Sequence, residues 1–82
     1  MSNKPVSEQN IKRLEYLSIY LRELRLNEGL TQEELSREIS LHKSTVLRAE
    51  NAKNLTLLSV FQLADALNIS PKELFLDIDW RS

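Results

Sequence analysis

The chain has 82 residues, of which 41% are hydrophobic and 28% are charged, and its formal net charge is −1. This length allows one small domain, and the composition is that of an ordinary globular protein. With no cysteine and one histidine, disulfides, thiolate chemistry and metal sites built on several histidines are excluded, so we expect no metal and no cofactor. No signal peptide or apolar run of ~20 residues is apparent, which predicts a cytoplasmic protein without a membrane segment.

The charges are distributed unevenly along the chain. Residues 65–82 contain four acidic and two basic side chains, whereas residues 43–53 contain three basic side chains and one acidic one. A local basic region matters more for an anionic partner than the total charge does. The distribution therefore favours a nucleic-acid partner.

The first predicted helix is long. Residues 1–6 are expected to form a flexible N-terminal arm, because Pro5 disfavours a helix before Ser7. After Ser7, which can cap a helix, apolar side chains recur every three or four positions, and the helix should end near Glu28. Gly29, the single glycine, follows where a left-handed residue commonly ends a helix. The expected buried stripe is Ile11, Leu14, Leu17, Leu21 and Leu24.

Two shorter helices are predicted on either side of a tight turn at residues 39–41. Thr31 can cap the first of them while Glu34, three residues later, reaches back to the Thr31 amide, an arrangement called a capping box. The second should run from about residue 42 to about residue 51. Together they would form a helix–turn–helix.

Two further helices complete an all-α, five-helix fold. Thr56 can cap the fourth, and the sequence Ser70-Pro71-Lys72-Glu73 opens the fifth with a capping serine, a proline at the first helical position and a glutamate at the third. The domain is expected over residues 7–76, followed by a C-terminal tail over residues 77–82. The expected inward residues are Leu57, Val60, Phe61, Ala64 and Leu67 on the fourth helix and Leu74 and Phe75 on the fifth.

The third predicted helix has two different sides. Leu41, Val46 and Ala49 fall on the side that would pack inward. The opposite side offers two cations, a hydroxyl, an amide and an apolar side chain. An α-helix fits the ~12 Å wide major groove of B-DNA, and a preceding helix joined by a tight turn can hold it there. The outward residues are Lys43, Ser44, Leu47, Arg48 and Asn51.

Residues 18–75 resemble the XRE family of helix–turn–helix domains, the group of the phage repressors and Cro proteins. The resemblance rests on LRELRLNEGLTQEELSREISLHKSTVLRAEN followed by TLLSVFQLADALNISPKELF. Arg25, the Thr31-Gln32 pair and Glu50 match the family pattern. The resemblance implies a lambda-repressor-like fold that binds double-stranded DNA, with a structural ion pair between Arg25 and Glu50.

The resemblance also implies roles for individual residues. Side chains at the start of the second helix, at the start of the third and in the following loop match positions that contact DNA phosphates, and the outer side of the third helix matches positions that face bases. The implied phosphate-contacting residues are Thr31, Gln32, His42, Asn51, Lys53 and Asn54. The implied base-facing residues are Lys43, Ser44, Leu47 and Arg48. Ala52 departs from the family pattern, because many members have glycine there and alanine at a positive φ is costly.

No arrangement for catalysis is recognisable. Glu33 and Glu34 are adjacent on a helix, so their side chains diverge by about 100° and cannot act on one substrate together. The sequence offers no glycine-rich phosphate loop and no Ser/His/Asp or Cys/His set. We therefore expect neither enzymatic activity nor a small-molecule substrate.

Some apolar residues exceed what one core requires. Tyr16, Ile19, Tyr20 and Leu26 lie off the main stripe of the first helix, and residues 76–80 alternate between apolar and acidic. Both groups could fold back on the core, or they could form a homodimer interface or a docking surface for a second protein.

Two functions remain open from the sequence. The first is a sequence-specific transcriptional regulator, in its simplest form a repressor, that binds a palindromic operator as a dimer. The alternative is an interaction module, such as the antitoxin of a toxin–antitoxin pair, in which the apolar surplus would cover a toxin.

Overall fold

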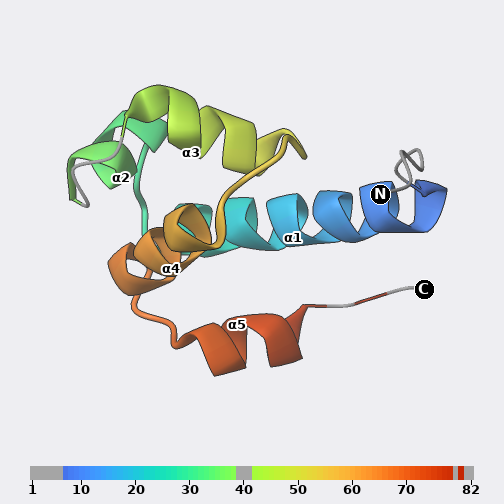
Figure 1. Cartoon of the computed structure of the whole chain (residues 1–82). Helices are drawn as coiled ribbons and strands as arrows, with labels where there is room; N and C mark the ends of the chain where they lie inside the picture. Colours follow the sequence, from blue (N-terminus) through green and yellow to red (C-terminus); the bar gives the residue numbers. More distant parts are fainter. Residues whose placement is uncertain (1–6, 39–41, 79, 81–82) are drawn as a thin grey trace.

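The computed structural model describes residues 7–38, 42–78 and 80, and within them it contains five α-helices and no strand (Figure 1). The all-α, five-helix prediction is confirmed. The predicted N-terminal arm and the turn at residues 39–41, including Leu41, lie outside the described residues. The helices are α1 (Glu8–Asn27), α2 (Gln32–Glu38), α3 (Lys43–Glu50), α4 (Leu57–Ala66) and α5 (Pro71–Asp77).

Local sequence determines where these helices begin and end. The Oγ of Ser7 accepts a hydrogen bond from the Asn10 amide, and the hydroxyls of Thr56 and Ser70 accept equivalent bonds at the starts of α4 and α5, each at 3.1 Å. Each of these bonds satisfies an amide that has no partner within the helix. Gly29 follows α1 with a φ of +70°, a conformation that glycine adopts without steric cost. The caps and the glycine stop are therefore confirmed.

One apolar core joins all five helices. Leu21 of α1, Leu35 of α2, Val46 of α3, Leu63 of α4 and Leu74 of α5 are each at most 2% exposed. Burying an aliphatic side chain of this size contributes about 1.5–3 kcal/mol relative to leaving it in water. This core holds α3 against α1 and α2, with one side of α3 facing inward (Figure 1).

Four residues that were expected to be buried are exposed instead. Ile11 is 46% exposed, because it lies near the start of α1, which projects beyond α3 and α4 (Figure 1). On α4, Leu57 and Phe61 are 65% and 41% exposed, and Leu63 is buried in their place. Phe75 of α5 is 38% exposed. Only one stripe of a helix can face the core, and on α4 that stripe is Val60, Leu63 and Ala64, which the buried C-cap residue Leu67 continues.

The beginning of the C-terminal tail packs against the domain. Ile78 is 4% exposed and belongs to the core. The indole N–H of Trp80 donates to the Phe75 carbonyl at 3.0 Å, and the two rings stack with centroids 6.5 Å apart. The Tyr20 hydroxyl donates to Asp77 at 3.1 Å. Burial, and then this contact with Asp77, raise the pKa of Tyr20.

None of the described helices combines the length and the apolar character that a membrane span requires.

Candidate nucleic-acid interface

The α3 helix presents one side to the core and the other to solvent. Val46 and Ala49 are 0% and 1% exposed, which confirms two of the three residues predicted to face inward. The four predicted base-facing residues, Lys43, Ser44, Leu47 and Arg48, are all exposed. Because the buried side fixes the rotation of α3, these four side chains face outward together. The arrangement suits a helix that inserts into a groove.

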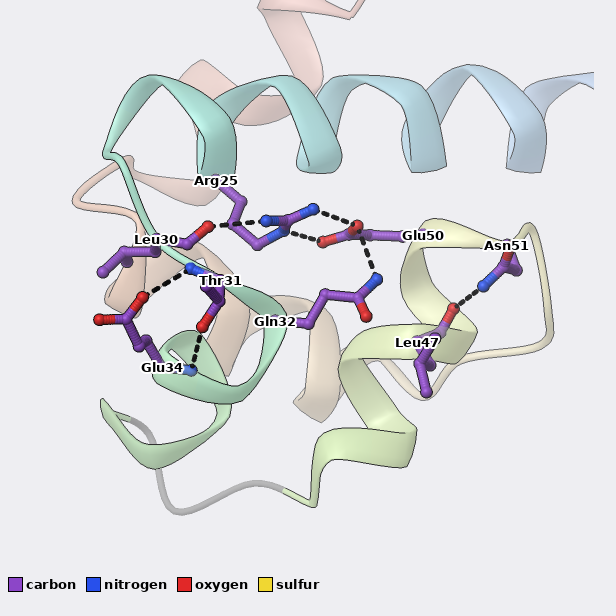
Figure 2. A network of polar contacts seen from close by, with 8 residues as sticks. All are labelled: Arg25, Leu30, Thr31, Gln32, Glu34, Leu47, Glu50 and Asn51. Carbon is purple, nitrogen blue, oxygen red and sulfur yellow. Dashed lines mark hydrogen bonds and ion pairs between the residues drawn. The ribbon is translucent and has the colours of Figure 1, made fainter.

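The start of α2 is fixed by reciprocal hydrogen bonds. The Thr31 amide donates to Glu34 Oε1 at 2.9 Å, and the Glu34 amide donates to Thr31 Oγ1 at 3.1 Å (Figure 2). The predicted capping box is therefore confirmed. The Thr31 amide, which stabilises the charged carboxylate, is the main cause that lowers the pKa of Glu34 below its ordinary value.

Beneath this helix start, Arg25 of α1 and Glu50 of α3 form a buried ion pair. Arg25 Nε lies 2.6 Å from Glu50 Oε2, and Arg25 Nη2 lies 3.0 Å from Glu50 Oε1, so the contact is bidentate. The two side chains are 9% and 5% exposed. Arg25 Nη1 also donates to the Leu30 carbonyl at 2.7 Å, which ties the segment before α2 to the same pair. The implied ion pair is present.

Gln32 joins this pair from the first residue of α2. Its Nε2 donates to Glu50 Oε1 at 3.1 Å, while its Oε1 points away from the carboxylate (Figure 2). The sequence did not predict this bond, because nothing in the spacing of residues 32 and 50 indicates that they meet. The one signal that could have indicated it was the implied Arg25–Glu50 pair, because that pair places the end of α3 beside the end of α1, from which the chain continues into α2.

At the end of α3, two exposed side chains bond to nearby backbone carbonyls. Arg48 Nη2 donates to the Asn54 carbonyl at 3.1 Å, and Asn51 Nδ2 donates to the Leu47 carbonyl at 2.6 Å. Together with Lys53 they line an open depression of about 350 Å³. Arg48 therefore lies at the border between α3 and the following loop, and its guanidinium is tied to that loop through the Asn54 carbonyl.

The loop after α3 has a left-handed residue. Ala52 has a φ of +55°, and its amide donates to the Oγ of Ser18 at 2.9 Å. Ser18 of α1 is 5% exposed, so this hydrogen bond anchors the loop to the buried side of α1. Lys53 and Asn54 are exposed beside it. The departure noted in the sequence thus lies at a position where glycine would be favoured.

His42 lies at the other end of α3. It is the residue before the helix, is exposed, and makes no capping hydrogen bond with its side chain. The residues predicted to contact phosphates thus lie at the starts of α2 and α3 and in the loop that follows α3.

In the described ranges, no three or more histidine, cysteine, aspartate or glutamate side chains gather into a site that could hold a metal ion.

Comparisons with known proteins place this geometry in a family. The family model for helix-turn-helix domains matches residues 21–74. The restriction-modification controller protein C.AhdI from Aeromonas hydrophila is 40% identical in sequence, with a TM-score of 0.73 over 78% of this chain and 98% of that chain. The controller protein C.Esp1396I, crystallised as a tetramer with its natural 35-base-pair operator, is 28% identical, with a TM-score of 0.72 over 87% of this chain and 90% of that chain.

A search of curated proteins found no match. The match to the family model covers more than half of the chain, and the likeness to C.AhdI extends over nearly all of that protein. The chain belongs to the XRE family of helix–turn–helix domains.

Proposed function

We propose that this XRE-family chain is a controller protein of the restriction–modification type, which binds operator DNA as a dimer and regulates transcription there. The observation that carries the proposal is the outward side of α3, where Lys43, Ser44, Leu47 and Arg48 are exposed while Val46 and Ala49 anchor the helix. The 40% identity to C.AhdI supports the specific class of regulator. In the simplest mechanism the bound dimer blocks transcription and so acts as a repressor.

The proposed mechanism separates positioning from reading. Contacts to phosphates fix the register of the protein on the duplex, and contacts to base edges select the sequence. Leu47 is suited to a thymine methyl group, and Lys43 and Arg48 are suited to the acceptor atoms of guanine. The proposed phosphate-contacting residues are Thr31, Gln32, His42, Asn51, Lys53 and Asn54. The proposed mechanism involves no catalytic step. The proposed location of the DNA-bound protein is the cytoplasm.

The dimer is proposed to form through α4 and α5. Both helices expose large apolar side chains, and three of these are at least 65% exposed in a single copy of the chain. Exposed apolar surface of this kind favours association with another protein surface. A second copy suits a palindromic operator, since two α3 helices would then read half-sites ~34 Å apart. The exposed residues are Leu57, Leu58, Phe61, Phe75 and Leu76.

The antitoxin alternative assigns the same apolar side chains to a toxin. Sedimentation of the purified chain separates the two proposals. A dimer formed without any other protein supports the controller proposal, whereas a monomer that associates only with a second protein supports the antitoxin.

The controller proposal is tested by selecting bound sequences from random DNA at a fixed salt concentration. An inverted repeat is expected, and recovery of no preferred sequence would contradict the proposal. On the selected operator, Arg48→Ala should weaken binding by ~1–3 kcal/mol and relax the sequence preference. Lys53→Ala should weaken binding evenly across sequences and reduce the salt slope by about 0.9.

The matched control is Lys72→Ala, which removes an exposed cation from α5. If Lys72→Ala reduces operator affinity as much as Arg48→Ala and Lys53→Ala do, the loss reflects total charge, and the assignment of the interface to α3 and its loop is wrong.

A further inference from the structure

The Glu50 carboxylate accepts hydrogen bonds from two different helices. Arg25 of α1 donates two of them, at 2.6 and 3.0 Å, and Gln32 of α2 donates a third at 3.1 Å (Figure 2). The ion pair is buried, whereas Gln32 is only half-buried. Gln32 therefore connects a buried charge pair with the surface on which the proposed phosphate contacts lie.

The chemistry of the Gln32 carboxamide makes this bond directional. The amide nitrogen has two N–H donors, and the amide oxygen is only an acceptor. A rotation of the amide by 180° would place Oε1 against the Glu50 carboxylate, where two acceptors would face each other. Glu50 therefore holds Nε2 inward with one N–H occupied. Among the residues that the structure describes, none accepts a hydrogen bond from the second N–H, which can then donate in a fixed direction.

We infer that Glu50 is a positioning residue for DNA binding, because it orients Gln32 so that the second Nε2–H donates to a phosphate oxygen. This inference rests on the proposed function. A donor held in place before binding loses less conformational freedom when the complex forms than a freely rotating side chain does. Gln32 thus binds the phosphate through its own N–H, and Glu50 acts only through Gln32.

Arg25 makes this arrangement compatible with DNA. An uncompensated carboxylate beside the backbone of a duplex would repel the phosphates. The bidentate contact with Arg25 compensates the charge of Glu50, so its oxygens can hold Gln32 without opposing the duplex. Arg25 also bonds to the Leu30 carbonyl at 2.7 Å, two residues before Gln32. Arg25 therefore fixes both the backbone that leads into α2 and the Glu50 carboxylate, which orients Gln32, the first residue of α2.

The inference predicts an unusual salt dependence. Gln32→Ala removes a neutral donor, so operator affinity should fall about tenfold while the slope of log K against log salt stays unchanged, because no counterion release is lost. Lys53→Ala should reduce that slope by about 0.9. The two variants thus distinguish a positioned neutral contact from a charged one on the same surface.

The decisive experiment is a double-mutant cycle with Glu50→Gln, measured by fluorescence anisotropy on the selected operator. Folding of every variant is first verified by circular dichroism at the assay temperature. Gln32→Ala should cost about tenfold in the parent and less than twofold in Glu50→Gln, because the carboxamide at position 50 can either accept from or donate to Gln32 and so no longer selects one orientation of its amide. Lys53→Ala is the control and should cost the same in both backgrounds. If Glu50→Gln does not fold, Glu50→Asp retains the charge and withdraws the carboxylate from Gln32.

A second measurement tests the orientation in the free protein. The two side-chain amide protons of Gln32 should have widely separated NMR shifts in the parent, because one of them is bonded to a carboxylate. The separation should decrease in Glu50→Asp. Equal losses from Gln32→Ala in both backgrounds, or no loss in a parent that binds its operator, would overturn the inference alone. A parent that selects no operator would overturn the proposed function and this inference together.

Discussion

The α2–α3 and α4–α5 regions are built in the same way, but one presents a polar surface and the other an apolar surface. Each is a pair of short helices, and hydroxyl caps at Thr31, Thr56 and Ser70 define the starts of α2, α4 and α5. The surface of α2–α3 is polar, and Gln32 is bonded to the buried Arg25–Glu50 pair beneath it. The surface of α4–α5 instead continues the apolar character of the core, with Leu57, Leu58 and Leu76 at 65%, 66% and 71% exposure.

The contrast indicates what each surface is suited to contact. Hydrogen bonds are directional, so a surface whose donors are held in place suits a polar partner with a regular array of acceptors, such as a DNA backbone. Burial of apolar surface is non-directional and scales with area, which suits a second protein surface. A buried ion pair adds little net stability compared with apolar packing. We therefore infer that the Arg25–Glu50 pair contributes more to the positions of Leu30 and Gln32, which bond to it, than to stability.

The largest expected effect comes from breaking the polar region at its centre. Arg25→Ala leaves the Glu50 carboxylate buried without its cation, which should destabilise the fold by ~3–5 kcal/mol. Urea denaturation measures this loss. Lys12→Ala, which removes an exposed cation from the same helix, is the control and should be within about 0.5 kcal/mol of the parent. A loss below about 1 kcal/mol for Arg25→Ala would show that water reaches Glu50.

The next effect concerns the apolar region. Phe61→Lys places a charge on the exposed side of α4, and it should weaken the proposed dimer by ~2 kcal/mol or more while the monomer stays folded. Sedimentation equilibrium measures the dissociation constant. Leu47→Lys is a matched control, because Leu47 is 40% exposed and Phe61 is 41% exposed, but Leu47 lies on α3. A dimer weakened by Leu47→Lys and not by Phe61→Lys would reverse the assignment of the two surfaces.

Sequence reasoning succeeded where the decisive interactions are local. The capping box of Thr31 and Glu34, the glycine stop at Gly29 and the start of α5 at Ser70 each depend on residues within four positions of each other. Their hydrogen bonds follow from residue type and spacing alone. The Arg25–Glu50 pair spans 25 positions, and it was predicted only because the family pattern relates those two positions.

Sequence reasoning failed where the outcome depends on how helices meet. On α4 the apolar residues exceed one stripe, so the pattern did not reveal that Leu63 is buried and that Leu57 and Phe61 are exposed. The Gln32–Glu50 bond depends on two helix ends that converge in three dimensions. The roles of the predicted base-facing and phosphate-contacting residues stay predictions, which the operator experiments test.

A smaller effect is expected in the loop that borders the polar region. Ala52 has a φ of +55°, where a Cβ costs about 1 kcal/mol. Ala52→Gly should therefore stabilise the fold by ~0.5–1 kcal/mol, and its amide can still donate to Ser18. Asn68→Gly is the control, because Asn68 has a φ of +57° but asparagine tolerates this region better than alanine does. Thermal unfolding should thus rank the gain from Ala52→Gly above that from Asn68→Gly.

The smallest effect is a pH dependence that belongs to the start of α2. The folded state lowers the pKa of Glu34, chiefly through the Thr31 amide, so the unfolded chain binds the proton more readily. The resulting stabilisation is fully present above the ordinary carboxyl pKa of 4.5 and is lost as the pH falls through the folded value. Glu34→Gln should therefore be slightly less stable than the parent at pH 7 and equal to it at pH 2. Thermal unfolding across this range measures the difference, and Glu33→Gln, which removes an exposed carboxylate from the same turn, is the control. Equal pH profiles for Glu34→Gln and the parent would mean that the capping box contributes nothing through charge, leaving the buried ion pair as the main polar constraint on α2.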